Sequence, residues 1–235
     1  MMNSREFARR RRTLQQQMAD RSLAIVPAAP HPIRNRDVEY PYHPDSDFYY
    51  LTGFAEAEAL LLLKRVGRKF TWMLFCQERN PEMEQWTGER LGTERAVTEL
   101  GAHQAWPIEQ WEKQLPELLT GVEQLYFNLG DGTSVEQALL KQLKQFRQRN
   151  RAGVVFPLSI HTLDPLLHEM RLIKSSAELK AMRKAATISA QAHRHAMQQC
   201  HIGMSEQQLE GEILHQFNQQ GSRTVAYDTI VAGGN

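Results

Sequence analysis

Apolar residues in this sequence gather in short blocks that alternate with longer amphipathic stretches. The blocks cover residues 23–26, 59–63, 70–76 and 122–128, and glycine, proline or charged residues bound them. Blocks of this length and setting are typical of buried β-strands. The charged segment 64–69, which contains Gly67, predicts a turn that joins the second and third strands as a hairpin. A further short strand is predicted at 154–156, before Pro157.

Between these strands, helical spacing of apolar residues predicts helices over 4–18, 93–100, 108–119 and 133–149. In the last of these, Val135, Leu139, Leu143 and Phe146 recur at three- or four-residue intervals. Alternating strands and helices predict an α/β fold, in which helices cover a sheet. Because some neighbouring strands read as hairpins, we expect a mixed sheet.

The last quarter of the chain has a different pattern. Ser175 with Glu178, and Ser205 with Gln208, have the spacing of capping boxes that open helices to about residues 200 and 221. Residues 224–232 then read as a strand, which needs neighbours to pair its backbone groups. The sequence therefore predicts two domains: 1–172, which is closed, and 173–235, which begins a second core without completing it.

Composition narrows the class of protein. The chain has 235 residues, 41% hydrophobic content and a formal net charge of +1, so no overall field favours nucleic acid or a membrane surface. Two cysteines do not make a disulfide framework, and the start has no apolar run typical of a secretory signal. Since no apolar run is long enough to span a bilayer, we expect a soluble cytoplasmic protein.

One run of charge, Arg9 to Arg12, has two interpretations. It could be a patch for nucleic acid or a partner, or the solvated face of the first helix. We favour the solvated face, because nothing basic or aromatic nearby extends the run.

The candidate catalytic and metal-binding residues in the sequence cannot be assembled into one site. On a helix, His193 and His195 point roughly 200° apart and cannot share a metal ion. Glu212 and His215 have the Glu-x-x-His spacing of di-metal helical bundles, but the second copy that such sites need does not occur. Cys76 lies in an apolar block and is expected to be buried and inert. Residue chemistry alone identifies no catalytic residue.

The most distinctive stretch is 39–54, which holds four of the six tyrosines. Asp45, Ser46 and Asp47 offer side-chain oxygens for a turn, and Phe48 to Leu51 read as a short aromatic strand. Composition alone favours the interpretation of this stretch as a buried loop-and-strand corner of the core over a functional interpretation.

Together with later segments, this stretch resembles the amino-terminal part of bacterial Xaa-Pro aminopeptidases, also called aminopeptidase P. The resemblance is carried by ordered segments across nearly the whole chain: Phe7–Arg12, Glu39–Tyr42, Ser46–Phe54, the Trp-x-Gly-x-Arg-x-Gly loop at Trp86–Gly92, His168–Ser175, Ala177–Ala186, Leu209–Glu212 and Tyr227–Val231. It implies a creatinase-like α/β domain followed by the first helices and strand of a pita-bread catalytic domain.

The resemblance also implies an activity, the release of an N-terminal residue that precedes proline. In the complete enzyme, two Mn²⁺ ions bound by two aspartates, one histidine and two glutamates would activate a water molecule. All five positions fall beyond Asn235, so no metal ligand is assigned here. We therefore expect this chain alone to bind no metal pair and to be inactive, with peptides carrying proline in second position as substrates of the complete enzyme.

Two residues, Asp37 and Trp86, match positions that, by resemblance, line the substrate cleft from a neighbouring subunit in a homo-oligomer such as a tetramer. A carboxylate could hold the substrate amine or a partner arginine, and an indole could pack on proline. Their structural alternatives are a turn cap for Asp37 and a buried loop anchor for Trp86. The alternative for the whole chain is a non-catalytic assembly module.

Overall fold

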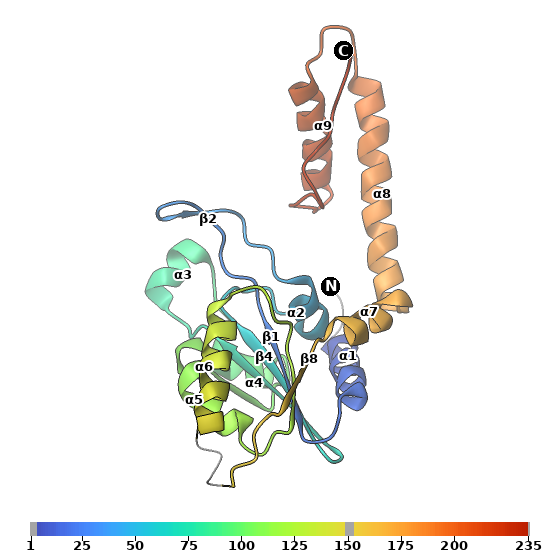
Figure 1. The fold of residues 1–235 in the computed structure, drawn as a ribbon. Coiled ribbons are helices and arrows are strands. Elements are labelled where there is room, and N and C mark those ends of the chain that lie inside the picture. The colour runs from blue at the N-terminus through green and yellow to red at the C-terminus, as the bar shows by residue number, and fades with distance from the viewer. Residues whose placement is uncertain (1–3, 149–152, 235) are drawn as a thin grey trace. The chain divides into compact units, whose positions relative to one another are not determined.

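A computed structural model describes residues 4–148 and 153–234 of the chain. The chain divides into two compact units, Met1–Ile173 and Lys174–Asn235 (Figure 1). The first unit holds the strands β1 (Ser22–Pro27), β2 (Ile33–Asn35), β3 (Val38–Glu39), β4 (Leu60–Val66), β5 (Lys69–Cys76), β6 (Gln104–Pro107), β7 (Gln124–Tyr126) and β8 (Ser159–His161). Its helices are α1 (Ser4–Gln17), α2 (Ser46–Thr52), α3 (Pro81–Thr87), α4 (Gly92–Thr98), the 3₁₀ turn η1 (Ile108–Gln110), α5 (Trp111–Leu119), α6 (Ser134–Gln148) and α7 (Asp164–Leu172).

Six of these strands form one mixed sheet in the order β6-β5-β4-β1-β7-β8. Strand β4 pairs antiparallel with both β1 and β5, whereas the pairs β5–β6, β1–β7 and β7–β8 are parallel. The expected hairpin is confirmed, with Leu62 opposite Met73. The α/β class with a mixed sheet is therefore confirmed.

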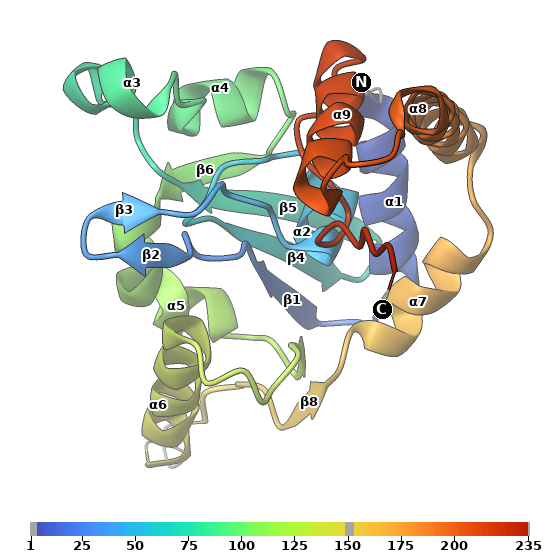
Figure 2. The same cartoon turned by 90° about the horizontal axis from the view of Figure 1, so that it is seen from above.

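Helices cover both faces of this sheet (Figure 2). Alternate residues of a strand point to opposite faces, so the central strands supply two cores. Leu61 and Leu63 join the core beneath α1, α2, α4 and α7, and Leu60 and Leu62 join the core beneath α5 and α6. Strands buried on both faces explain why the apolar blocks are continuous.

Residues 46–52 form helix α2, so the prediction of a strand at 48–51 is wrong. Asp45 is the N-cap, and its carboxylate accepts hydrogen bonds from the backbone N–H groups of Asp47 and Phe48. Gly53 ends the helix with a left-handed backbone conformation, φ 68°. These two local signals outweigh the strand preference of the aromatic residues between them.

The arginine run on α1 is partly buried, which contradicts the expected solvated face. Arg10 and Arg11 are 1% and 4% exposed. Their Nη1 atoms donate hydrogen bonds of 3.0 and 2.8 Å to the carbonyl oxygens of Tyr50 and Leu51, which lie in the last turn of α2. Helix ends leave such carbonyls without partners, and the negative end of the helix dipole attracts cations. The two guanidinium groups also lie over the rings of Tyr50 and Trp72, at 4.1 and 3.9 Å.

Three further elements differ from the sequence prediction. No strand forms at 154–156; the strand β8 follows Pro157 instead and pairs with β7. Helices α3 and α7 were not predicted, and both begin with proline at the first or second helical position, which favours a helix start. The predicted end of the helix at Arg149 lies outside the described residues.

The second unit consists of the helices α8 (Ser176–Gln199) and α9 (Glu206–Gln219) and the segment that follows them. Both predicted capping boxes are present, at Ser175 with Glu178 and at Ser205 with Gln208. The strand predicted at 224–232 is not formed, because none of the described residues of this unit offers a strand to pair with it. Across the described residues, no helix is both long and apolar enough to cross a membrane.

Candidate functional site

Asp37 lies at the tip of a small antiparallel hairpin made by β2 and β3. Arg36 turns the chain there with a positive φ of 50°, and Tyr40 N–H donates to Pro32 O at 2.8 Å to close the base of the hairpin. Asp37 is exposed, and no hydrogen bond to its carboxylate is found among the described residues. In the described structure, the carboxylate is therefore free to contact another molecule.

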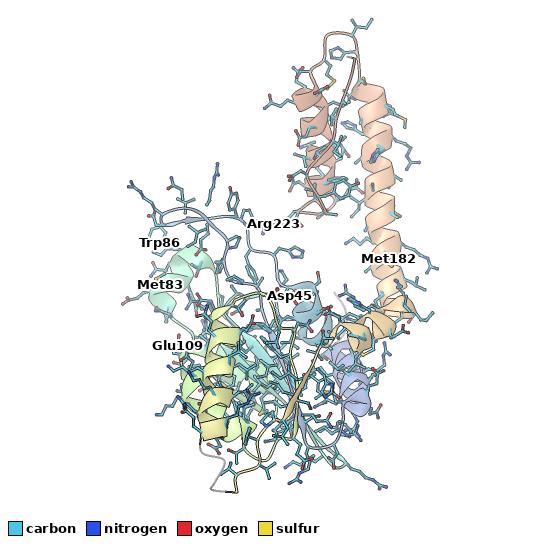
Figure 3. All side chains as sticks on the ribbon, viewed as in Figure 1. Asp45, Met83, Trp86, Glu109, Met182 and Arg223 are labelled. Carbon is cyan, nitrogen blue, oxygen red and sulfur yellow. The ribbon has the colours of Figure 1, made fainter. Side chains whose placement is uncertain are left out.

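Trp86 lies on α3, a short helix with no buried residue. Asn80 caps this helix by accepting hydrogen bonds from the backbone N–H groups of Glu82 and Met83. Arg79 forms an ion pair with Glu84 at 2.7 Å, and the hydrogen bond from Arg79 lowers the pKa of the Glu84 carboxyl. These contacts fix the helix, yet Trp86 is 86% exposed and stands beside Met83 on α3 (Figure 3). The alternative of a buried loop anchor does not agree with this exposure.

Exposed apolar side chains accompany both candidates. On the hairpin they are Ile33, Val38 and Tyr40, and on α3 they are Met83 and Trp86. Exposed apolar groups that gather on neighbouring elements are candidates for contact with a partner or a ligand. We call these five side chains together with Asp37 the hairpin–α3 surface.

Glu56, which sequence reasoning missed, links the bases of the two projections. Its backbone carbonyl accepts a 3.3 Å hydrogen bond from the hydroxyl of Tyr42, which follows the hairpin. Its Oε1 accepts a 2.8 Å hydrogen bond from Leu91 N–H, in the loop after α3. Burial raises the pKa of Glu56, and its Oε2 is buried with no partner among the described residues. Burial likewise raises the pKa of Tyr42 to about 12.

Helix α4 begins at residue 92, where the backbone conformation favours glycine. Gly92 has a φ of +73°, and a Cβ atom there would lie 2.8 Å from the Cγ atom of Arg79. This is the last glycine of the Trp-x-Gly-x-Arg-x-Gly segment, so the segment fixes the course of the chain between α3 and α4. In the sequence, the spacing of the two glycines in this segment is the signal for such a backbone conformation.

The histidine pairs do not form a metal site. On α8, His193 Nδ1 lies 2.8 Å from Ser189 O, while His195 Nε2 lies 2.7 Å from Glu212 Oε2 on α9. The two histidines thus point to different partners, as a helix requires. Within residues 4–148 and 153–234, no group of three or more His, Cys, Asp or Glu side chains is arranged to hold a metal ion. The described donors therefore do not fit a pair of Mn²⁺ ions.

Cys76 is fully buried in β5, as expected. Burial raises the pKa of its thiol to about 12, so a reactive thiolate does not form near neutral pH.

Comparison with known proteins gives two family matches. Residues 7–126 match the model of the aminopeptidase P N-terminal domain, and residues 180–235 match the metallopeptidase family M24. The chain is 39% identical over 234 residues to a Xaa-Pro aminopeptidase of Escherichia coli, covering 99% of this chain and 53% of that protein.

Two solved structures are similar throughout the matched region. Proline aminopeptidase P II from Yersinia pestis has a TM-score of 0.92 at 41% identity, covering 96% of this chain and 52% of that one. The low-pH form of aminopeptidase P from E. coli has a TM-score of 0.94 at 38% identity, covering 98% and 52%. This chain spans about half the length of these relatives.

Proposed function

This chain belongs to the aminopeptidase P family, and we propose that it forms the amino-terminal part of a Xaa-Pro aminopeptidase, which releases an N-terminal residue preceding proline. The family resemblance inferred from the sequence is confirmed. Similarity to a Xaa-Pro aminopeptidase along 99% of the chain is the observation that carries the proposed activity.

The described residues contain no cluster of side chains that could hold the metal ions of this proposal. In a complete enzyme, two Mn²⁺ ions would activate water and stabilise the tetrahedral intermediate. The match of residues 180–235 to the metallopeptidase family M24 supports this part of the proposal. We expect the 235-residue chain by itself to hold no metal pair and to hydrolyse no peptide bond.

The contribution of this chain is the hairpin–α3 surface. In a homo-oligomer of the complete enzyme, Asp37 binds the charged amine of the substrate or orders a partner arginine. Trp86 packs on the proline ring or on the residues beyond it. The exposure of both side chains supports these roles, because each is available to a molecule outside its own unit.

The proposal also includes the domain boundaries and the cellular compartment of the protein. Residues 1–172 are the amino-terminal domain and residues 173–235 begin the catalytic domain, close to the division of the chain into compact units. The protein acts in the cytoplasm, which agrees with two free cysteines, Cys76 and Cys200.

A chimera tests the proposed activity. Residues 1–235 are joined to the remaining half of the E. coli relative, and hydrolysis of Xaa-Pro peptides is measured with added Mn²⁺. We expect hydrolysis by the chimera and none by the 235-residue chain. A folded, metal-loaded chimera that cleaves ordinary N-terminal residues but not Xaa-Pro bonds would contradict the proposed substrate class.

The second candidate function is an assembly module without catalysis, favoured by the exposed apolar groups of the hairpin–α3 surface. The same experiment separates the two candidates. A chimera that assembles into oligomers but cleaves nothing, although the complete E. coli enzyme cleaves under the same conditions, would favour the module.

A further inference from the structure

Cationic side chains lie near both faces of β5, but their contacts differ between the two faces. Phe70 and Trp72 point to the face covered by α1, where the guanidinium groups of Arg12 and Arg11 lie 3.7 and 3.9 Å from their rings. Because side chains alternate along a strand, Lys69, Thr71 and Met73 point to the other face. On the α1 face, the guanidinium groups therefore lie over aromatic rings. On the opposite face, no such contact of Lys69 with a ring is found among the described residues.

That opposite face is hollowed between the β4–β5 hairpin, β6 and α5. The hollow has a volume of about 780 Å³. This volume falls within the range of roughly 300–1,000 Å³ that is usual for small-molecule sites. The lining residues that bear on its chemistry are Lys64, Lys69, Trp106, Gln110, Lys113 and Glu117.

The register of the hairpin explains why lysines gather here. Lys64 pairs with Thr71 and Val66 pairs with Lys69, so these side chains share one face. Lys113 reaches the same hollow from α5. Three ammonium groups from three elements thus surround one space, and Glu117 is the single acid among the lining residues.

None of the three lysines forms an ion pair with a described residue. Lys64 Nζ donates a long hydrogen bond of 3.5 Å to Leu118 O, near the end of α5. Burial lowers the pKa of Lys64, and the carboxylate of Glu117 acts in the opposite direction without cancelling this effect. A bound anion would add negative charge beside these three ammonium groups, where the lining residues provide only the carboxylate of Glu117.

The remainder of the lining favours an organic ligand over a bare ion. Trp106, which stacks on Phe75 at 5.1 Å, and Met73 give the hollow an apolar floor that is continuous with the core. Gln104, Gln110 and Gln114 add amide groups that can donate or accept hydrogen bonds. An apolar floor with a few convergent polar groups is the usual construction of a small-molecule site.

We propose that this hollow binds a small organic anion through phosphate or carboxylate oxygens held by Lys64, Lys69 and Lys113. The site is separate from the hairpin–α3 surface and does not rest on the proposed peptidase activity. It is a concave pocket on one face of the sheet, and the net charge of the chain is only +1, so neither feature favours an extended nucleic acid.

Binding of two probe anions to the 235-residue chain tests the proposal. Inorganic pyrophosphate and citrate are titrated by calorimetry at low salt, since screening weakens contacts between exposed charges. We expect saturable binding of at least one probe, with a dissociation constant in the millimolar range or tighter. Tighter binding of pyrophosphate would identify a phosphorylated ligand, and tighter binding of citrate a polycarboxylate.

Substitutions locate the binding. The double variant Lys64→Gln/Lys113→Gln should weaken binding about a hundredfold, or about tenfold for each charge-assisted contact removed. Lys113→Arg should retain binding. Lys144→Gln, which removes an exposed lysine of α6 away from the hollow, is the matched control and should leave the affinity unchanged.

A second measurement does not depend on the variants folding. In the unsubstituted chain, the bound probe should protect Lys64, Lys69 and Lys113, but not Lys144, from acetylation by acetic anhydride. Absence of saturable binding by both probes would overturn the proposal. So would equal affinity in the folded double variant, or equal acetylation of these lysines with and without probe.

Discussion

Arg10 both stacks on the ring of Tyr50, at 4.1 Å, and donates through Nη1 to the carbonyl oxygen of the same residue, at 3.0 Å. A single side chain thus joins α1 to the end of α2. Its Nε also lies 3.3 Å from Glu6 Oε1, so a buried cation is matched by a carboxylate, a carbonyl and a ring.

Arg10→Met should destabilise the first unit by about 3 kcal/mol or more, because it leaves the buried Tyr50 carbonyl and the Glu6 carboxylate without this partner. Urea unfolding followed by tryptophan fluorescence measures the change. All four tryptophans lie in the first unit, so the signal reports that unit alone.

The matched control is Arg9→Met, which removes an ion pair with the same Glu6 from an exposed position. Exposed pairs contribute little, so we expect a loss of about 0.5 kcal/mol. Equal losses of stability in the two variants would show that the buried contacts of Arg10 stabilise the unit no more than the exposed ion pair of Arg9 does.

Trp86→Ala should change the stability of the first unit by no more than about 0.5 kcal/mol, since the side chain is 86% exposed. In the catalytically complete chimera, the same substitution should reduce cleavage of longer peptides more than cleavage of dipeptides. Steady-state kinetics on both substrate lengths measures this split. Equal loss on both lengths would count against the cleft role of Trp86.

The control for Trp86 is Trp111→Ala on α5, which removes a buried indole. Truncation of a buried aromatic side chain typically costs about 3–5 kcal/mol. We expect this variant to lose stability by that amount.

Glu56→Gln should gain stability relative to the unsubstituted chain as pH rises. Burial raises the pKa of Glu56, so the folded chain holds its proton more tightly than the unfolded chain. Ionisation therefore opposes folding, and stability is lost as pH rises through the raised pKa. The glutamine does not ionise and has no such loss.

Urea midpoints test this sign when they are measured at about pH 4, near the ordinary pKa of a glutamate side chain, and at about pH 7, well above it. Glu58→Gln, an exposed neighbour, is the control. A difference between Glu56→Gln and the unsubstituted chain that stays constant with pH would contradict the assignment.

Cys76 and Cys200 should differ in reactivity. Cys76 is buried with a pKa raised to about 12, and Cys200 is exposed. A thiol reagent near neutral pH should therefore modify one thiol per native chain and two per unfolded chain. The native variant Cys200→Ser should have no modified thiol. Rapid modification of this variant would contradict the burial of Cys76.

Amide hydrogen exchange should be slower in the central sheet than in the second unit. Strands β1 and β4 are buried on both faces, whereas α9 has no buried residue and α8 buries Ala192 and Ala196. Local opening follows such differences in burial. Uniform protection across β1 (Ser22–Pro27), β4 (Leu60–Val66) and α9 (Glu206–Gln219) would contradict this prediction.

The family matches agree with what the sequence determined from ordered motifs. Segments such as Ser46–Phe54 and Trp86–Gly92 carry the resemblance whatever their secondary structure, so the aromatic segment was a correct family marker even where its predicted strand was wrong. Both capping boxes were also readable, because a serine and its partner three residues later form a local unit.

Only the tertiary structure decided which polar side chains are buried. Arg10 and Arg11 look like a solvated run in the sequence, because the carbonyls and rings that receive them lie about 40 or more residues away. Glu56 and Lys64 also depend on partners far along the chain: the Glu56 carboxylate accepts from Leu91 N–H, and Lys64 Nζ donates to Leu118 O near the end of α5. Local spacing fixes helix starts and strand blocks, whereas the burial of a charge depends on partners that only the folded chain brings together.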